Sequence, residues 1–313
     1  MTFEHASQCW YLTGPTASGK TAVGIELARR LDAEIVSLDS MAVYRGMDIG
    51  TAKPTPAEQA AAAHHLLDLI EPDEPYSVAQ YLEAAGQCVE AIRGRGRTPL
   101  FVGGSALYLT AILRGISAGP PPDWPLRRRL EARAREQGPA PLYDELARRD
   151  PQAAARLHPN DLRRVVRALE VLETTGRPIS AHQQHFDHGR PADHWRAFTL
   201  EWPREELHRR IERRVAQMFE AGLVDEVRRL QAGPPLGRTA SQAVGYREVL
   251  DYLAGRCTLA EAQIRIVQRT RQFARRQHTW LRRLTECRPV PCGPDFDAAA
   301  LADQVCHVGR LGG

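Results

Sequence analysis

Short apolar runs alternate with stretches of helical spacing through the first third of the chain. The apolar runs have the length and composition of strands buried on both faces of a sheet, at 9–13, 33–40 and 98–104. Stretches whose apolar residues fall on one helical face lie between and after them, at 21–31, 74–96 and 105–113. Because strands that alternate with helices form parallel sheets, the pattern predicts an α/β fold.

The pattern changes at the proline-rich stretch "AGPPPDWP", which begins at Ala118. Helical and highly charged sequence follows as far as Gly176, and an irregular stretch then leads to a further predicted strand at 196–202. Long helical patterns continue to about Leu284. The predicted division is a first core part at 1–117, a helical insertion at 118–195, a second core part with basic helices at 196–284 and a weakly structured tail at 285–313.

The composition indicates which partners, compartment and metal sites are to be expected. The chain has 313 residues, of which 43% are apolar, and a net charge of +4, so an anionic partner must meet a local basic surface. No apolar run approaches the ~18 residues of a membrane span, and the N-terminus has no secretory pattern. Six cysteines without a CxxC pair predict neither a disulfide framework nor a zinc site. We therefore expect a cytoplasmic protein without membrane contact.

The first predicted strand leads into a phosphate-binding pattern. Gly14, Gly19, Lys20 and Thr21 match G-x-x-x-x-G-K-[ST], and a predicted helix follows directly. In this context backbone N–H groups and a helix N-terminus converge on an anion, Lys20 reaches phosphate oxygens and the Thr21 hydroxyl can bind Mg²⁺. A chance match would lack these flanking elements. The predicted fold class is therefore α/β with a P-loop NTPase-like core.

Acidic residues are placed unusually for an ATPase of this class. Such enzymes usually carry an acid at the end of a strand that helps to hold Mg²⁺, whereas the strand at 98–104 ends in Gly103, Gly104 and Ser105. This glycine turn predicts a second backbone site for an anion or a closely approaching ligand. Asp39 follows the second strand instead. It is equally well explained as a general base beside the phosphate loop and as a solvated or capping residue.

A long helical pattern from Thr258 to Leu284 carries charge of nearly one sign. Its acidic residue is Glu261, and its basic residues are Arg265, Arg269, Arg271, Arg275, Arg276, Arg282 and Arg283. Charge runs are usually solvated faces, but those usually mix signs, so this stripe indicates a surface that contacts phosphates. Trp280 within it is expected in the core. A smaller cluster in the insertion consists of Arg163, Arg164 and Arg167.

Several of these stretches together resemble one enzyme family. "GPTASGKT", "DSMAVYRGMDIGTAKP", "PLFVGGSALYL", "RLHPNDLRRVVRALEV", "VGYRE" and "RRQHTWLRR" occur in this order, and the second is not shared with ordinary P-loop kinases. The chain resembles the bacterial tRNA dimethylallyltransferases over about Tyr11 to Arg283. The resemblance implies transfer of a dimethylallyl group from dimethylallyl diphosphate, with Mg²⁺, to the exocyclic amine of the adenosine 3′-adjacent to the anticodon. The expected partner is the anticodon stem-loop of tRNA, and the expected state is a monomer.

The resemblance also implies roles for individual residues. Asp39 would be the general base, with Lys20, Thr21 and Ser105 as the other catalytic residues and Thr21 as the Mg²⁺ ligand. The implied diphosphate-binding residues are Gly14, Thr16, Ala17, Ser18, Gly19, Lys20, Thr21 and Arg214. The implied tRNA-binding residues are Asp39, Ser40, Met41, Ala42, Ser105, Arg127, Arg163, Arg164, Arg167, Gln242, Gly245, Arg247, Arg275, Arg276, Gln277, Trp280 and Arg282.

Other functions stay open on the residues alone. "RRIERR" and "LRRRLE" each offer neighbouring arginines, so the register of Arg214 and Arg127 is not fixed by sequence. A P-loop kinase of a small acceptor would explain the phosphate loop but not the basic helices. A prenyltransferase that acts on free adenine nucleotides would need no RNA surface. A non-catalytic RNA-binding protein would need neither Asp39 nor an intact Lys20.

Overall fold

The computed structural model of the chain describes residues 3, 5–115, 119–182 and 191–311. The chain divides into two compact units. One contains the insertion helices, and the other is built from the chain on both sides of the insertion. Among the described residues no helix is both long enough and apolar enough to cross a membrane.

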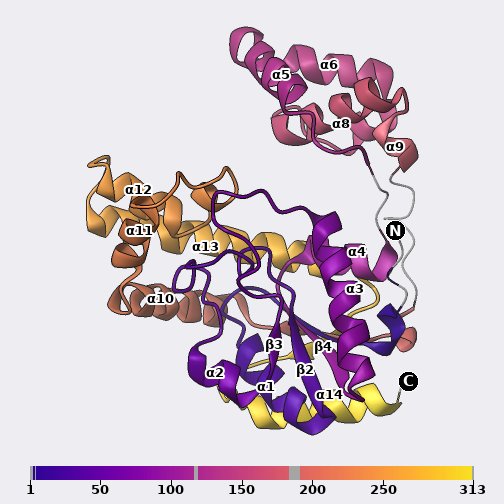
Figure 1. The fold of residues 1–313 in the computed structure, drawn as a ribbon, viewed down its shortest axis with the longest axis vertical. Coiled ribbons are helices and arrows are strands. Elements are labelled where there is room, and N and C mark those ends of the chain that lie inside the picture. Colours follow the sequence, from indigo (N-terminus) through magenta and orange to yellow (C-terminus); the bar gives the residue numbers. More distant parts are fainter. Residues whose placement is uncertain (1–2, 4, 116–118, 183–190, 312–313) are drawn as a thin grey trace. The chain divides into compact units, whose positions relative to one another are not determined.

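A six-stranded sheet forms the centre of the larger unit (Figure 1). Every pairing between its strands is parallel, and their order is β3-β2-β4-β1-β5-β6. The strands are β1 (Trp10–Thr13), β2 (Ala33–Ser37), β3 (His64–His65), β4 (Thr98–Gly103), β5 (Arg196–Glu201) and β6 (Arg288–Pro291). The predicted α/β fold with a parallel sheet is confirmed.

Helices cover both faces of this sheet. Alternate residues of β1 point to opposite faces, so Leu12 packs with Leu27 of α1 (Lys20–Leu31), while Tyr11 on the other face stacks on Phe101 of the neighbouring β4. The other helices around the sheet are α2 (Pro56–Ala61), α3 (Val78–Gly94), α4 (Ala106–Arg114) and α14 (Ala298–Leu311). Because β1 is central and buried, the loop that follows it lies in the middle of the sheet's carboxyl edge.

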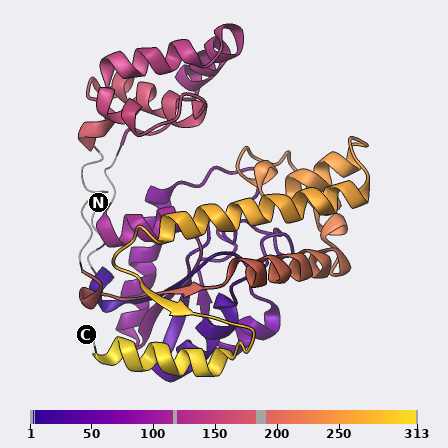
Figure 2. The same cartoon turned by 180° about the vertical axis from the view of Figure 1, so that it is seen from behind.

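The C-terminal tail belongs to the core. β6 is the edge strand next to β5, and α14 packs against α1, as Figures 1 and 2 show. Gly309 lies so close to the Trp10 ring that an added Cβ atom would come within 2.2 Å of it. The prediction of a weakly structured tail at 285–313 is therefore wrong. The two prolines of "RPVP" argue against a strand in the sequence, but a strand that contains proline can still pair at the edge of a sheet.

A second group of helices packs on the segment that follows β2. These helices are α10 (Arg204–Glu220), α11 (Leu223–Gln231), α12 (Tyr246–Leu253) and α13 (Leu259–Leu281). Figure 2 shows α13 as the longest of them, above the sheet. Their apolar faces enclose Val43, Tyr44 and Met47. The buried Glu226 accepts hydrogen bonds from the backbone N–H groups of Asp48 (3.0 Å), Ile49 (2.7 Å) and Gly50 (3.1 Å), which fixes this irregular segment.

The insertion has a hydrophobic core of its own. Its helices are α5 (Trp124–Gln137), α6 (Ala140–Arg149), α7 (Pro151–Ala155), α8 (Leu162–Thr175) and α9 (Ile179–His182). Leu130, Leu142, Leu146, Val165 and Leu169 fill the space between them and are almost fully buried. Short 3₁₀ turns complete the described structure at η1 (Ala6–Gln8), η3 (Ala192–His194) and η4 (Ala240–Gln242).

Candidate phosphate site and arginine surface

The phosphate loop joins β1 to α1 and is built from strained positions. Gly14 (φ 151°), Ala17 (φ 64°) and Gly19 (φ 87°) all have positive φ, and Gly19 directly precedes the first residue of α1. A Cβ atom on Gly19 would also come within 2.5 Å of the Phe296 ring. Glycine is therefore required there on both counts, and the helix begins with its free N–H groups at the loop.

Two side chains hold the carbonyl groups of this loop. The Arg210 Nε donates to the Ala17 oxygen (2.8 Å), and the Trp202 Nε1 donates to the Ser18 oxygen (3.0 Å). The Arg210 guanidinium also lies 4.2 Å from the centre of the Trp202 ring and 4.8 Å from that of Phe296. Burial lowers the pKa of Arg210. These contacts stabilise the left-handed Ala17, and neither Arg210 nor Trp202 is predicted from the sequence.

Lys20 lies inside the curve of the loop. Its Nζ donates to the Pro15 oxygen (2.7 Å) and to the Ser18 Oγ (3.4 Å). Loss of solvent and the charge of Arg214 lower its pKa to about 7, and the opposing charge of Asp39 offsets part of this effect. Burial likewise lowers the pKa of Arg214, whose Nη2 donates to the Thr51 oxygen (3.4 Å). The site thus contains two cations and one carboxylate. Its net positive charge favours the binding of an anion.

The spacing of the arginines in α10 explains which of them reach the loop. Arg210 and Arg214 are four residues apart and therefore lie on one helical face. Arg209 and Arg213 are exposed, and Arg209 pairs with Glu206 on the same helix. Within "RRIERR" the structure therefore assigns Arg210 to the loop carbonyls and Arg214 to the surroundings of Lys20.

Ser105 contacts the turn that carries Asp39, where β2 and β4 end. The Asp39 Oδ1 accepts from the Met41 N–H (2.8 Å), and the Ser105 Oγ accepts from the Ser40 N–H (2.9 Å). Asp39, Ser40 and Met41 are partly exposed, whereas Ala42 is buried. Two of the three predicted neighbours of Asp39 can therefore contact a ligand directly.

The glycine turn after β4 serves the protein chain itself. A Cβ atom on Gly103 would lie 2.1 Å from the Leu38 oxygen, and one on Gly104 would lie 2.4 Å from the Gln277 Nε2. The Ser105 N–H donates to the Leu38 oxygen (3.1 Å) and is thus already used. The prediction of a second backbone site for an anion at this turn is wrong, because the closely approaching groups belong to the protein.

A Mg²⁺ ion at this site would need ligands from the substrate as well as from the protein. The described residues include no cluster of three His, Cys, Asp or Glu side chains that could hold a metal ion. Thr21 stands at the start of α1, and its hydroxyl has no hydrogen bond within the described ranges. Mg²⁺ commonly binds through one or two protein oxygens together with substrate phosphates and water. The Thr21 hydroxyl beside the anion site fits that mode.

The insertion uses two of its predicted RNA-binding arginines internally. Arg127 forms a bidentate ion pair with the buried Glu170 (2.8 Å for both contacts), and Arg167 pairs with the same carboxylate. The Arg167 Nη2 also donates to the Pro120 oxygen (2.9 Å). These arginines keep the pKa of Glu170 low despite its burial. Arg163 and Arg164 are exposed, and Arg164 pairs with Asp161 (3.3 Å) at the surface.

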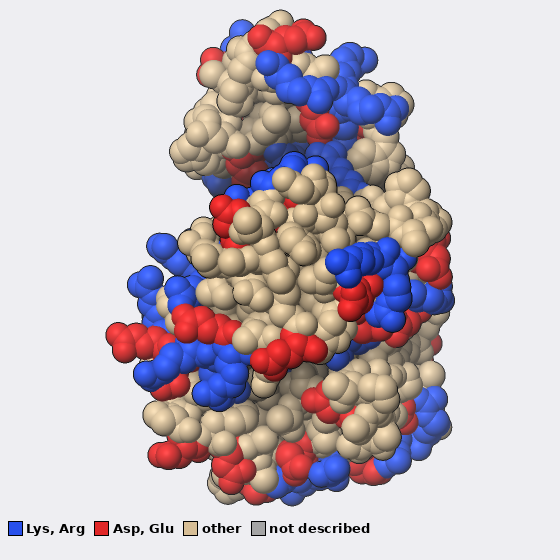
Figure 3. Space-filling view, turned by 90° about the vertical axis from the view of Figure 1, so that its left-hand side faces the viewer, with Lys and Arg blue, Asp and Glu red and all other residues tan. Residues whose placement is uncertain are grey.

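The arginine stripe of α13 is less uniform than its sequence suggests. Arg269 pairs with Glu248, and Arg271 pairs with Glu212. Figure 3 shows basic and acidic side chains interspersed on one face of the molecule. Acidic residues of the neighbouring helices α12 and α10 therefore neutralise this part of the predicted phosphate-contacting stripe. The stripe members Arg275, Arg276 and Arg282 are exposed and form no ion pair within the described part of the chain.

The remaining predicted RNA contacts differ in exposure. Trp280 is 37% exposed and donates its Nε1 to the Thr110 Oγ1 (3.2 Å), so its predicted core position is wrong. Gln242 in η4 is exposed, and Gly245 precedes α12 with a φ of 98°. Gln277 is only 7% exposed, and its amide contacts the protein backbone.

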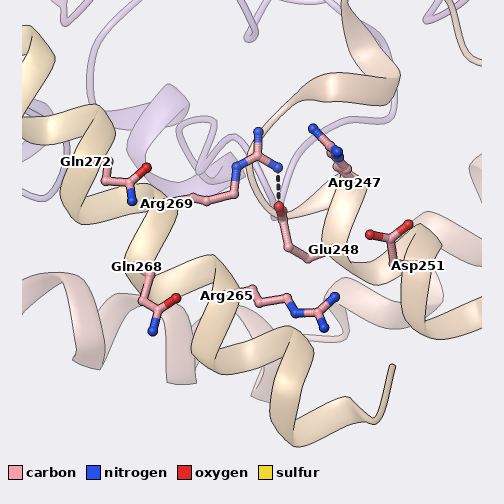
Figure 4. A pocket seen from close by; sticks show the side chains of 7 residues that line it. All are labelled: Arg247, Glu248, Asp251, Arg265, Gln268, Arg269 and Gln272. Carbon is pink, nitrogen blue, oxygen red and sulfur yellow. Dashed lines mark hydrogen bonds and ion pairs between the residues drawn. The ribbon is translucent and has the colours of Figure 1, made fainter. Parts of the chain in front are cut away.

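A cavity of about 280 Å³ lies between α12 and α13 (Figure 4). It is lined by Arg247, Glu248, Asp251, Arg265, Gln268, Arg269 and Gln272. The pair of Glu248 and Arg269 crosses it, and Asp251 is bound by Arg256 at 2.6 Å. Arg247 and Arg265 are exposed and have no ion pair within the described ranges. The cavity thus belongs to the basic surface and not to the phosphate loop.

Comparisons with known proteins agree on one family. The family model of the IPP transferases matches residues 42–284, and that of the isopentenyl transferases matches residues 7–69. The tRNA dimethylallyltransferase of Rhodopirellula baltica is 48% identical over 91% of this chain and 90% of its own length. That of Thiobacillus denitrificans is 47% identical over 96% of both chains.

Solved structures give the same result for the fold. A full-length tRNA isopentenylpyrophosphate transferase from Bacillus halodurans is 37% identical, with a TM-score of 0.69 and 98% of each chain covered. A eukaryotic dimethylallyltransferase acting on tRNA is 26% identical, with a TM-score of 0.75 over 95% of this chain and 77% of its own. Both similarities extend over nearly the whole of the present chain, including the insertion.

Proposed function

The chain belongs to the IPP transferase family and transfers a dimethylallyl group to tRNA, and from this premise we propose how its residues divide the reaction. The donor is dimethylallyl diphosphate. The acceptor is the exocyclic amine of the adenosine 3′-adjacent to the anticodon. The observation that carries the proposal is the phosphate loop with Lys20 inside its curve, where Arg214 and Asp39 lie close enough to act on the Lys20 charge.

The phosphate loop binds the diphosphate as the leaving group. The allylic C–O bond breaks, its electron pair goes to the diphosphate oxygen, and negative charge grows there. Lys20, Arg214 and the N–H groups at the start of α1 would stabilise that charge. Mg²⁺ bound through the Thr21 hydroxyl and the diphosphate would supply further charge neutralisation. The loop residues implied by resemblance, from Gly14 to Thr21, line this proposed site.

Asp39 acts on the acceptor. The amine lone pair is delocalised into the adenine ring, so its attack on the allylic carbon is aided if a carboxylate takes the amine proton as the C–N bond forms. The products are prenylated adenosine, diphosphate and a proton held by Asp39. Ser105, which orients the Ser40 N–H beside Asp39, keeps this turn in place.

The RNA lies along exposed arginines. Arg275, Arg276 and Arg282 on α13 and Arg163 and Arg164 on the insertion would contact phosphates. The target base stacks within its loop and has to leave the stack to reach Asp39. We place the reaction in the cytoplasm, and a monomer is sufficient because the site is built from one chain.

Incubation with dimethylallyl diphosphate, Mg²⁺ and unmodified tRNA tests this function. Mass analysis of the digested tRNA should find one adenosine per molecule with an added dimethylallyl group, and sequencing of fragments should place it next to the anticodon. Prenylation of free adenine nucleotides instead, or magnesium-dependent phosphoryl transfer from ATP to a small acceptor, would replace the proposal with one of the two alternative functions.

A further inference from the structure

Gln277 links two loops that are distant in sequence. Its Oε1 accepts from the Thr16 N–H in the phosphate loop (2.8 Å), and its Nε2 donates to the Gly104 oxygen after β4 (2.8 Å). The side chain is 7% exposed, whereas its neighbours Arg275 and Arg276 face solvent. The same turn of α13 therefore offers cations on one side and an amide to the phosphate loop on the other.

The amide of Gln277 is fixed in one orientation. If its oxygen and nitrogen were exchanged, a donor would face the Thr16 N–H and an acceptor would face the Gly104 oxygen. The Gln277 amide is also tightly packed against Gly104. A Cβ atom on Gly104 would lie 2.4 Å from the Gln277 Nε2 and 3.1 Å from the Gly14 oxygen. A carboxylate or an apolar side chain of similar size would lose at least one of the two bonds.

These bonds continue to the acceptor side of the site. Gly104 is followed by Ser105, whose Oγ accepts from the Ser40 N–H next to Asp39. A short series of contacts thus runs from Thr16 in the phosphate loop through Gln277 to the turn that carries Asp39. Its two ends are the groups proposed to hold the diphosphate and to take the amine proton.

We propose that Gln277 is a positioning residue for the reaction and not an RNA contact. It holds the phosphate loop at a fixed distance from the turn of Asp39, so that the allylic carbon and the amine meet in a reactive geometry. Displacement of reacting groups by about 1 Å can cost about 10²-fold in rate. This inference rests on the proposed function, which assigns the two ends of the link.

The test uses the full chain with Gln277→Met, which keeps the length and removes both bonds, and Gln277→Glu, which keeps an acceptor for Thr16. Three quantities are measured for each: the affinity for unmodified tRNA, the single-turnover transfer rate with both substrates saturating, and the affinity for inorganic diphosphate with Mg²⁺. We expect tRNA affinity within about twofold of the parent and a rate lowered by about 10–100-fold, more in the Met variant. Binding of inorganic diphosphate with Mg²⁺ should weaken in parallel.

Two further variants make the result interpretable. Gln217→Met removes an exposed amide on α10, outside the proposed binding surfaces, and should leave the transfer rate unchanged. Gly104→Ala should displace the Gln277 amide and lower the rate similarly, and it should add little to a Gln277 substitution. Should the Gln277→Met protein fail to fold by circular dichroism, Gln277→Glu and Gly104→Ala decide the question.

Several results would overturn the inference. One is a loss of tRNA affinity in the Gln277 variants with an unchanged rate at saturation, which would make Gln277 an RNA contact. Another is a parental rate and parental diphosphate binding in all of these variants. If instead the parent protein bound inorganic diphosphate but prenylated no tRNA, the proposed function would fail, and the diphosphate measurement would still report on the link.

Discussion

The phosphate loop and the exposed side of α13 both carry cations, but they hold them in different ways. Lys20 and Arg214 are partly enclosed by protein, donate to backbone oxygens and have pKa values that desolvation lowers. Arg275, Arg276 and Arg282 are exposed and form no ion pair within the described residues. Enclosed charges act strongly on one bound group, whereas exposed arginines act mainly through released counterions and depend on salt.

This difference predicts that the two regions can be damaged separately. Changes near the loop should lower the rate of the chemical step and leave RNA binding intact. Changes on the exposed side of α13 should weaken RNA binding and leave the chemical step intact at saturating tRNA.

Lys20→Ala should have the largest effect. Loss of one neutral donor to a developing anion costs about 10²–10³-fold, and here a full positive charge is removed from the leaving group, so transfer should be nearly abolished. The tRNA affinity, measured by filter binding, should match the parent because the α13 arginines are untouched. Near-normal turnover at saturating dimethylallyl diphosphate would refute the assignment of the loop to the diphosphate.

Asp39→Asn should rank second. The amide keeps the shape and can still accept the Met41 N–H bond, but it cannot take the amine proton. We expect a single-turnover rate lowered by about 10²–10⁴-fold with little change in tRNA affinity. A rate that holds while tRNA affinity collapses would make Asp39 a binding residue.

Diphosphate affinity should fall as pH rises above about 7. In the free protein Lys20 has a pKa of about 7, lowered by burial and by Arg214. A bound anion favours the charged amine and raises this pKa, so binding takes up a proton above pH 7 and weakens there by at most about tenfold per pH unit. Calorimetry in two buffers of different ionisation enthalpy measures the proton uptake. Lys20→Arg, which stays charged, should remove it, and a pH-independent affinity in the parent would contradict this account.

Arg276→Ala and Arg282→Ala should have the smallest effects. Each removes one proposed phosphate contact, so the slope of log affinity for tRNA against log salt should flatten by about 1 in each variant. Affinity for dimethylallyl diphosphate should stay at the parental value. Arg209→Ala, which removes an exposed arginine paired with Glu206, is the matched control. Unchanged slopes in both variants would place the RNA on another surface.

Sequence periodicity and local motifs predicted the parallel sheet, the phosphate loop and the long helices. They failed where the outcome depends on contacts between distant segments. The sequence does not show that Arg127 and Arg167, whose predicted role is contact with RNA, both pair with the buried Glu170. In the same way, the glycine turn after β4 looks like an anion site until Leu38 and Gln277 are seen to approach it.

The C-terminal tail also depends on contacts between distant segments, and here the sequence predicted too little structure. Its sequence is too rich in proline and alanine to signal a strand and a core helix, yet β6 extends the sheet and α14 buries the Trp10 side of β1. Phe296 between them packs on Gly19 and Arg210 behind the phosphate loop. The sequence gives no local signal for contacts of this kind, because each partner is an ordinary apolar or basic residue.

The separation of chemistry from RNA binding is tested most directly by single-turnover transfer as a function of tRNA concentration. The proteins are the parent, Asp39→Asn, Arg276→Ala and the double variant. We predict that Asp39→Asn lowers only the plateau rate, that Arg276→Ala raises only the half-saturating tRNA concentration, and that the double variant shows both effects with free energies that add within about 0.5 kcal/mol. A lowered plateau in Arg276→Ala, or a double variant that departs clearly from additivity, would contradict the account.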